Sequence, residues 1–226
     1  MKIAEEIKAT KNLSIKTYFL SSYLISNRIS PYISEIYIKL NISPNTITIH
    51  MILSGFLGAI YFAIPNIFIK IIGALFIHLW FILDCSDGEV ARYTKKYSKY
   101  GKELDYMAHL INHPLFGIAL FFSLYQLKRY DFYTLIFIVI ASNFIDYFTR
   151  NLVSLNEIIN LKSKIDNKGF MPGPGKWTLK KVILFIINIF AMYPNLVLFG
   201  VIIYFFDYFI GTDILFNYLV LNIIFS

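Results

Sequence analysis

Long apolar segments dominate the sequence after a mixed N-terminal stretch. Apolar residues crowd six segments, near 46–64, 66–84, 104–127, 132–152, 179–192 with its neighbours, and 196–223. A helix rises about 1.5 Å per residue, so about 20 residues cross a hydrocarbon core about 30 Å thick. Backbone polar groups inside a membrane must be satisfied within the fold, and the two-residue alternation of strands is nowhere visible. The pattern predicts an all-α, polytopic membrane protein, a six-transmembrane-helix bundle.

The first 43 residues have a different character. Residues 1–16 are charged and predict a solvated helix, whereas residues 17–40 carry apolar side chains at helical spacing among Ser, Asn, Arg and Lys. The second pattern is typical of short helices that lie at a membrane interface. Ser43 and Pro44 suit an N-cap and a first helical position. We therefore expect N-terminal cytoplasmic and juxtamembrane helices over 1–43 and a transmembrane domain over 44–226.

Composition narrows the class of protein. The chain is 57% hydrophobic and 15% charged, with a mean hydropathy of +0.60, which excludes an ordinary soluble domain of 226 residues. Its single cysteine, Cys85, excludes a disulfide framework and a Cys-rich zinc site. Residues 1–16 lack an apolar core, so no cleavable signal peptide is expected.

Basic residues indicate the orientation. All 21 Lys and Arg residues except Lys70, Lys128 and Arg129 fall in the N-terminal segment, the 92–102 linker or the 150–181 connection. By the positive-inside rule these three segments face the cytoplasm. Because the basic residues follow the ends of the spans, the net charge of +7 favours contact with anionic membrane lipids over nucleic-acid binding. We expect a cytoplasmic-membrane protein that binds no nucleic acid.

Ionisable residues gather where the second span ends and the third begins. Asp84 and Asp87 share a helix face with the small Ala91, and Asp105 and His109 share a face of the next helix. Three converging carboxylates repel one another unless they bind a cation, and hard oxygen ligands favour Mg²⁺ or Mn²⁺. The spacing predicts a metal site at the three aspartates; a solvated acidic helix cap is the alternative.

The same stretch carries a spaced motif. From Asp84 it reads D-x2-D-G-x2-A-R-x8-G-x3-D-x3-H. It resembles the signature of the CDP-alcohol phosphotransferases, also called CDP-alcohol phosphatidyltransferases, which ends in a fourth aspartate. The matching positions are Asp84, Asp87, Gly88, Ala91, Arg92, Gly101 and Asp105, and His109 replaces the fourth aspartate. The residues Pro44, Asn45, Ile47 and Thr48 are also similar to the family's P-N-x-I-T entry to its first transmembrane helix.

The resemblance implies a metal-dependent enzyme. It would transfer a substituted phosphoryl group from a CDP-linked donor to an acceptor hydroxyl, release CMP and act as a homodimer. The positive-inside rule places the active site on the cytoplasmic side. The aspartates would hold Mg²⁺ or Mn²⁺, and the donor pocket would be formed by Thr48, Gly88, Ala91, Arg92 and Gly101. Phospholipid biosynthesis is the default; transfer of a small CDP-linked polyol or amino-alcohol phosphate to a lipid or glycan is the alternative.

His109 stands where the resemblance places the base that activates the acceptor. An imidazole binds Mg²⁺ poorly, so a second ion would be weakened, lost or replaced by one that tolerates nitrogen, such as Mn²⁺. With an unperturbed pKa of about 6.5, imidazole suits proton transfer at neutral pH. We predict that His109 is the general base, next to the catalytic carboxylate of Asp105. Acceptor binding, a structural role and a zinc pair with His113 remain alternatives, as does a non-catalytic scaffold or transporter that retains the fold.

Two features are candidates for the acceptor side. Asn143, Asp146 and Arg150 share one face of the fourth predicted span, and ionisable groups inside a span are costly enough to suggest function. Lys176 follows a Gly-Pro-Gly turn before the fifth span, where helix amides suit a phosphate. A packing pair between Asp146 and Arg150 and a glycine-rich membrane-entry turn are the alternatives.

Overall fold

The structure is a computed structural model that describes residues 2–11, 21–163, 178–179 and 193–225. Within these ranges the regular secondary structure is helical throughout, so the all-α prediction is confirmed there. The elements are α1 (Lys2–Thr10), a π-helical turn η1 (Ser22–Ser26), α2 (Asn27–Lys39), α3 (Pro44–Ala63), α4 (Ile67–Thr94), α5 (Gly101–Gln126), α6 (Phe132–Ser163), α8 (Tyr193–Ile210) and α9 (Ile214–Phe225).

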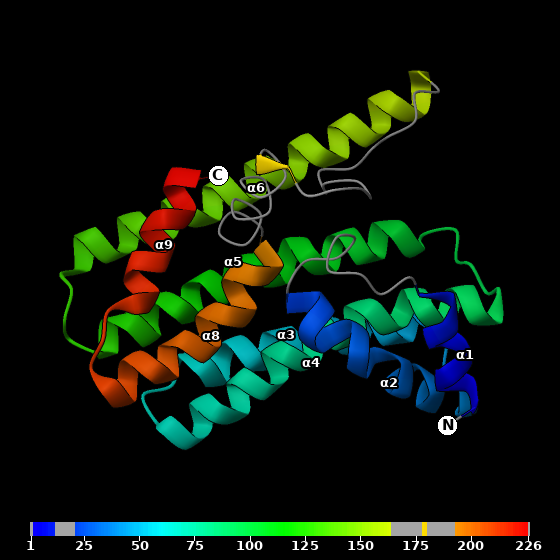
Figure 1. Cartoon of the computed structure of the whole chain (residues 1–226), viewed down its shortest axis with the longest axis horizontal. Coiled ribbons are helices and arrows are strands. Elements are labelled where there is room, and N and C mark those ends of the chain that lie inside the picture. The colour runs from blue at the N-terminus through cyan, green and yellow to red at the C-terminus, as the bar shows by residue number, and fades with distance from the viewer. Residues whose placement is uncertain (1, 12–20, 164–177, 180–192, 226) are drawn as a thin grey trace.

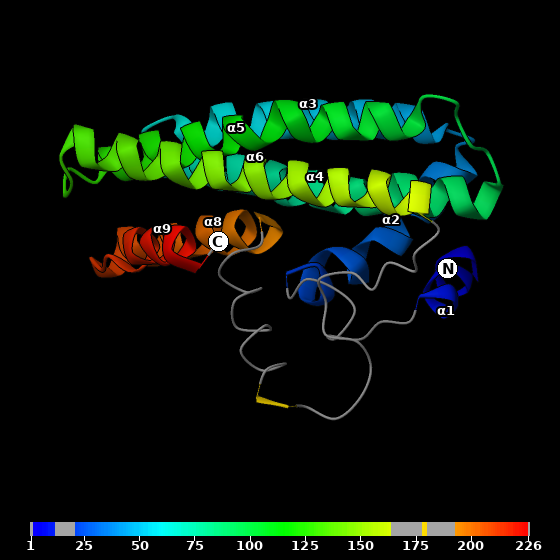
Figure 2. The same cartoon turned by 90° about the horizontal axis from the view of Figure 1, so that it is seen from above.

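Helices α3, α4 and α5 form the centre of the fold. Both α4 and α5 pack on α3, α2 packs on α4, and α6 packs on α5 and α9. Figures 1 and 2 show α8 and α9 (orange and red) near one end of the long helices, and α1 and α2 (blue) near the other. The linker from α4 to α5 lies at the end that α1 and α2 occupy (Figure 1). The N-terminal helices therefore lie beside the predicted site.

Local sequence explains where the central helices begin. The Ser43 side chain caps α3 by accepting a hydrogen bond from the Thr46 amide, and Pro44 is the first helical residue, as predicted. Asn66 caps α4 by accepting from the amides of Phe68 and Ile69. These caps satisfy backbone donors that a helix start leaves without partners.

Glycines set the distance between α3 and α4. A Cβ atom on Gly73 would lie 2.4 Å from the Phe62 backbone nitrogen and 2.9 Å from the Gly58 carbonyl oxygen. Such a close approach of two backbones is typical of small residues at helix crossings in membrane proteins. The position of α4 relative to α3 thus depends on the absence of a side chain at Gly73.

Gly73→Ala is expected to lower the melting temperature of the detergent-solubilised protein. The added methyl group meets backbone rather than a movable side chain, and overpacking of this kind typically costs about 1–3 kcal/mol. Gly200→Ala is the matched control, because a Cβ there would meet its nearest neighbour, Leu215 Cδ1, at 3.4 Å, an ordinary contact. Gly200 is also buried in a helix, so the control should melt at or above the wild-type temperature. Equal melting temperatures for the two variants would contradict the proposed crossing.

Lys70 connects three of these helices. It is one of the three basic residues outside the segments predicted to be cytoplasmic, and its side chain is buried, with 2% of the residue exposed. The ammonium donates to the Phe62 carbonyl at 2.7 Å and to the Ser123 hydroxyl at 2.9 Å. It also lies 5.2 Å from the centre of the Tyr204 ring. Lys70 therefore caps the C-terminal end of α3 inside the bundle.

The structure supports a membrane protein but not the count of six spans. Among the described residues, α3, α4 and α5 are long and apolar enough to cross a membrane. The apolar parts of the other large helices are shorter, at Phe132–Ile145, Leu196–Ile210 and Ile214–Ile224. The predicted span 179–192 lies outside the described residues except for Leu179.

The prediction of one continuous span over 196–223 is wrong. The chain breaks between α8 and α9 at Gly211, whose φ of 82° suits glycine. The buried Asp207 carboxylate accepts from the Thr212 hydroxyl at 2.6 Å and from the amides of Ile214 and Leu215 at 3.0 and 2.8 Å. Asp207 thus satisfies the first amides of α9 and fixes a second helix start that the apolar composition concealed.

The N-terminal region is helical where it is described. The charged segment contains α1, and η1 continues directly into α2. Pro31 lies inside α2. Residues 12–20 lie outside the described ranges, and the interfacial position of these helices stays a prediction.

Candidate active site

The site forms where α4 and α5 meet one end of α3. Helix α4 continues to Thr94, beyond the apolar stretch, and the chain turns through Lys95 in the left-handed region before α5 begins at Gly101. Asp84 therefore lies well inside α4, and Asp105 lies in the first turns of α5. Both carboxylates therefore belong to helices, whose backbone positions are fixed by packing, and not to the linker.

Three of the predicted residues come together as a cluster. One side-chain ligand atom from each of Asp84, Asp105 and His109 lies within 4.8 Å of the others. His109 Nε2 is 2.9 Å from Asp84 Oδ1 and 3.5 Å from Asp105 Oδ1. Two carboxylates and one imidazole at these distances could hold a divalent ion. Because one of the donors is nitrogen, the set suits Mn²⁺ better than Mg²⁺. We call these three residues the acidic cluster.

Asp87 is close to the acidic cluster but is held by another helix. Its Oδ2 accepts a hydrogen bond from the Thr48 hydroxyl of α3 at 2.9 Å. Thr48 is buried, with 3% of the residue exposed. The role of Asp87 as a metal ligand stays a prediction, whereas its hydrogen bond links the cluster region to the start of α3.

Aromatic and amide side chains surround His109. The buried Trp80 ring meets the His109 ring edge to face, with centroids 4.9 Å apart. Trp80 Nε1 donates to Asn112 Oδ1 at 3.0 Å, and Asn112 Nδ2 donates to the Ile52 carbonyl at 3.2 Å. Sequence reasoning missed Trp80 and Asn112, although they lie one helical turn from Asp84 and His109. They restrict the orientation of the imidazole.

His113 determines which nitrogen of His109 carries a proton. His109 Nδ1 lies 2.9 Å from His113 Nε2. When His113 donates across this contact, a neutral His109 donates from Nε2 to the Asp84 carboxylate, which only accepts. When His109 donates to His113 instead, the Nε2 lone pair faces the acidic cluster. In this second tautomer His109 can take a proton or bind a metal ion there.

A cavity of about 510 Å³ opens beside the cluster, and we call it the α3 cavity. Its wall includes every residue that sequence analysis assigned to the donor: Thr48, Gly88, Ala91, Arg92 and Gly101. Asp87 and Asp105 line it as well. A Cβ on Gly88 would come within 2.9 Å of an Arg92 guanidinium nitrogen, so glycine lets the guanidinium fold over the helix. The structure thus brings the predicted donor residues together around one polar space.

Ala91→Leu is expected to weaken binding of CDP about tenfold or more, equivalent to about 1.4 kcal/mol, because the larger side chain enters the α3 cavity. Thr94→Leu is the control on the same helix: Thr94 does not appear among the described residues that line the cavity. Isothermal titration with CDP and Mg²⁺ measures both. Unchanged CDP affinity in Ala91→Leu would place the nucleotide elsewhere.

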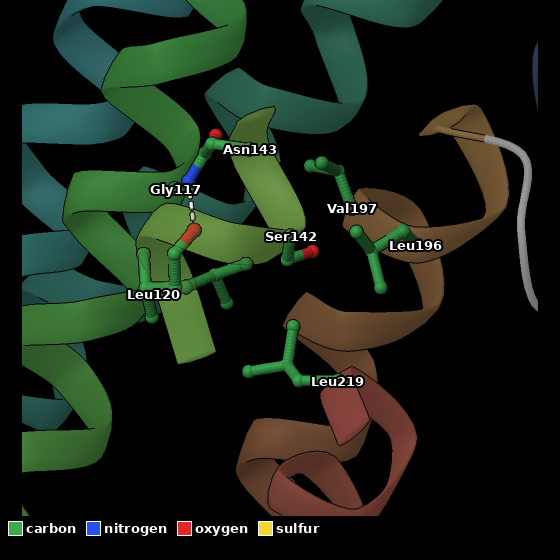
Figure 3. A pocket seen from close by; sticks show the side chains of 8 residues that line it. Gly117, Leu120, Ser142, Asn143, Leu196, Val197 and Leu219 are labelled. Atoms are coloured by element: carbon green, nitrogen blue, oxygen red, sulfur yellow. Dashed lines mark hydrogen bonds between the residues drawn. The ribbon is translucent and has the colours of Figure 1, made fainter. Parts of the chain in front are cut away.

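Asn143, a predicted acceptor residue, packs between helices. Its Nδ2 donates to the Val139 carbonyl of its own helix at 2.8 Å. Figure 3 shows it next to Gly117, where a Cβ would come within 2.0 Å of Nδ2. The adjoining void, about 20 Å³, has room for about one water molecule and none for an acceptor. The Asp146 and Arg150 side chains and all of Lys176 lie outside the described structure, so the acceptor assignments stay predictions.

The fold and the site together define a helical membrane protein in which a cluster of possible metal ligands lies beside a polar cavity. The profile of the family described as CDP-alcohol phosphatidyltransferase matches residues 41–213. The chain therefore belongs to the CDP-alcohol phosphatidyltransferase family, a family of transferases that move a phosphate-linked alcohol from a CDP-alcohol to a hydroxyl acceptor. Comparisons with curated proteins and with solved structures gave no match.

Proposed function

We propose that the protein is a divalent-metal-dependent CDP-alcohol phosphotransferase of phospholipid biosynthesis, with its active site on the cytoplasmic side of the cytoplasmic membrane. One observation carries this proposal: the α3 cavity, lined by all five predicted donor residues, ends at Asp105 of the acidic cluster. A nucleotide diphosphate bound in this cavity would have its phosphates next to the carboxylates. The basic residues of the linker support a cytoplasmic site.

The residues of the α3 cavity position the donor. Arg92 offers planar, charged donors to the diphosphate, and the small Gly88 and Ala91 let phosphate approach the helix. Thr48 holds the Asp87 carboxylate in place. Asp84, Asp87 and Asp105 would hold Mg²⁺ or Mn²⁺, which when bound would neutralise charge on the diphosphate and on the departing CMP.

His109 takes the proton of the acceptor. The acceptor oxygen attacks the phosphorus that carries the donor alcohol, and a new phosphorus–oxygen bond forms. The bond from this phosphorus to the CMP oxygen breaks, and CMP leaves with the electron pair. The acceptor proton passes to His109 Nε2, which carries a lone pair when His109 Nδ1 donates to His113.

The donor would carry a phosphatidyl group in the default case. The alternative is a small CDP-linked polyol or amino-alcohol phosphate that is transferred to a lipid or glycan. A homodimer is the expected assembly in either case.

CMP release by the purified, detergent-solubilised chain tests this function. CDP-diacylglycerol, CDP-glycerol and CDP-ethanolamine are offered as donors with Mg²⁺, Mn²⁺ or EDTA, each with a panel of hydroxyl acceptors. We expect acceptor-dependent CMP release with at least one donor, and its loss in EDTA. Nucleotide binding without turnover for every donor would favour the non-catalytic scaffold instead.

A further inference from the structure

A second and larger cavity lies beside α4, under the N-terminal helices. It measures about 850 Å³ and we call it the N-terminal cavity. One wall comes from α4 and the linker; the other comes from Ile7 and Thr10 of α1 and from Lys11, Ser22 and Asn27. Neither the metal site nor the α3 cavity accounts for this space.

The two cavities meet at the acidic cluster. Asp84 lines the N-terminal cavity, and Asp105 lines the α3 cavity, while both belong to the cluster whose ligand atoms lie within 4.8 Å of one another. Gly88, Arg92 and Tyr97 line both cavities and form the wall between them. A phosphate at the cluster is therefore accessible from two sides, as a transfer between two bound groups requires.

A buried polar network forms the floor of the N-terminal cavity. Glu89 of α4 is 3% exposed, and its carboxylate accepts from the Ser34 hydroxyl at 2.7 Å. Lys11 makes an ion pair with Glu89 and donates to Asn27 Oδ1 at 2.9 Å. The Lys11–Glu89 pair has no net charge. This part of the cavity wall therefore offers hydrogen bonds without attracting ligands of either charge.

Helix α1 is fixed as a wall of this cavity. The Ala4 amide donates to the Glu35 carboxylate of α2 at 3.0 Å, and the Tyr93 hydroxyl of α4 donates to Glu6 at 2.8 Å. Lys39, hydrogen-bonded to Glu35, lowers the pKa of that carboxyl to about 2, with the Ala4 amide adding to the effect. Glu35 is thus ionised at cytoplasmic pH and keeps α1 attached to α2.

The lining favours a small, hydroxylated occupant. A volume of about 850 Å³ falls in the range of small-molecule sites. Hydroxyl and amide groups from Thr10, Ser22, Asn27 and Tyr93 line it beside apolar groups such as Ile7, so it offers a polyol both hydrogen bonds and contacts for its carbon atoms. The charge of Lys11 is balanced by Glu89. Arg92 lines the α3 cavity as well, where it is proposed to bind the donor phosphates. Charge complementarity therefore favours an uncharged group.

We propose that the N-terminal cavity is a second substrate subsite that holds a small, uncharged, polyhydroxylated group. The assignment of a substrate role rests on the proposed function. The group is either the alcohol part of a CDP-linked donor or a free acceptor, and both place hydroxyls beside Asp84. Asn27 and the Lys11–Glu89 pair hold these hydroxyls.

Two Ser→Trp variants of the full chain test the subsite, one in each cavity. Ser22 lines the N-terminal cavity and Ser98 lines the α3 cavity, so each substitution adds an indole ring at the wall of one cavity. Titrations with Mg²⁺ use CDP, CDP-glycerol, and glycerol or myo-inositol in the presence of CMP. If the donor alcohol occupies the subsite, CDP-glycerol binds the wild type more tightly than CDP does. If a free acceptor occupies it, the polyol binds on its own.

Ser22→Trp is expected to reduce whichever polyol-dependent binding the wild type shows about tenfold, or about 1.4 kcal/mol, while the CDP affinity is kept. Ser98→Trp should weaken CDP instead. Retained CDP affinity also shows that Ser22→Trp is folded, and Asn27→Leu repeats the test without adding bulk. Polyol binding that is unchanged in Ser22→Trp, or absent from the wild type, would overturn the inference. So would binding of glycerol 3-phosphate in this cavity in place of the neutral polyols.

The binding assay separates this inference from the proposed function. Loss of polyol binding in Ser22→Trp supports the subsite even in an assay that detects no turnover. Normal acceptor-dependent CMP release by Ser22→Trp, with unchanged KM, would overturn the subsite and leave the transferase function intact.

Discussion

Asp84→Asn is expected to reduce metal-dependent CMP release about 10²- to 10³-fold, the range typical for loss of one preorganised electrostatic group. The substitution keeps the size of the side chain but removes a charge and a metal ligand. A large effect is expected because Asp84 belongs to the acidic cluster, contacts His109 Nε2 and lines the N-terminal cavity. Mn²⁺ binding, followed by electron paramagnetic resonance, should weaken in parallel.

Asp131→Asn is the matched control for this experiment. Asp131 lies between α5 and α6, where its carboxylate caps α6 by accepting from the Thr134 amide at 2.9 Å. Asparagine caps helices about as well as aspartate, so activity and stability should be kept. Near-normal CMP release and Mn²⁺ affinity in Asp84→Asn would remove the metal assignment. Asp87→Asn then asks whether the residue held by Thr48 is also a ligand.

His109→Ala is expected to lower kcat about 10²- to 10⁴-fold, the usual contribution of a general base, with CDP affinity nearly kept. The imidazole contacts both carboxylates of the cluster through Nε2, and truncation to alanine removes this proton acceptor. His109→Asp restores the family pattern and should recover activity or shift the metal preference from Mn²⁺ toward Mg²⁺. Steady-state kinetics with each metal measure both effects.

His50→Ala is the control for the loss of a histidine. His50 is an exposed residue of α3 whose Nδ1 contacts the Tyr37 hydroxyl at 3.1 Å, and it belongs neither to the acidic cluster nor to the described lining of the α3 cavity. Its kinetics should match the wild type. A full kcat with only a raised acceptor KM in His109→Ala would make His109 a specificity residue and remove the base assignment.

The sequence determined features that depend on neighbouring residues. Helix periodicity follows from local backbone hydrogen bonds, so the spacing of Asp84 and Asp87, or of Asp105 and His109, fixed which residues share a helix face. The start of α3 was predictable because Ser43 and Pro44 act within one turn. The seven motif positions identified the family, which the profile match confirmed.

The tertiary structure decided which faces meet. Asp84 and Asp87 share a face, yet Asp84 contacts His109 whereas Asp87 bonds to Thr48. The difference depends on the packing of α4 and α5 against α3, and Gly73 sets the spacing between α3 and α4 without any signal in the hydrophobic pattern. Asp207 likewise ends a span by binding amides beyond the break, a contact that composition does not reveal.

The N-terminal cavity is the clearest example of a feature that local sequence patterns do not predict. Its walls join Lys11 and Asn27 to Glu89, residues far apart in the chain. A local pattern marks the N-terminal segment as amphipathic and charged, but it does not say which helix receives the charges. Lys11 and Glu89 become partners because burial of an ion requires a counter-ion within reach. The packing of α1 on α2 and of α2 on α4 brings the two together.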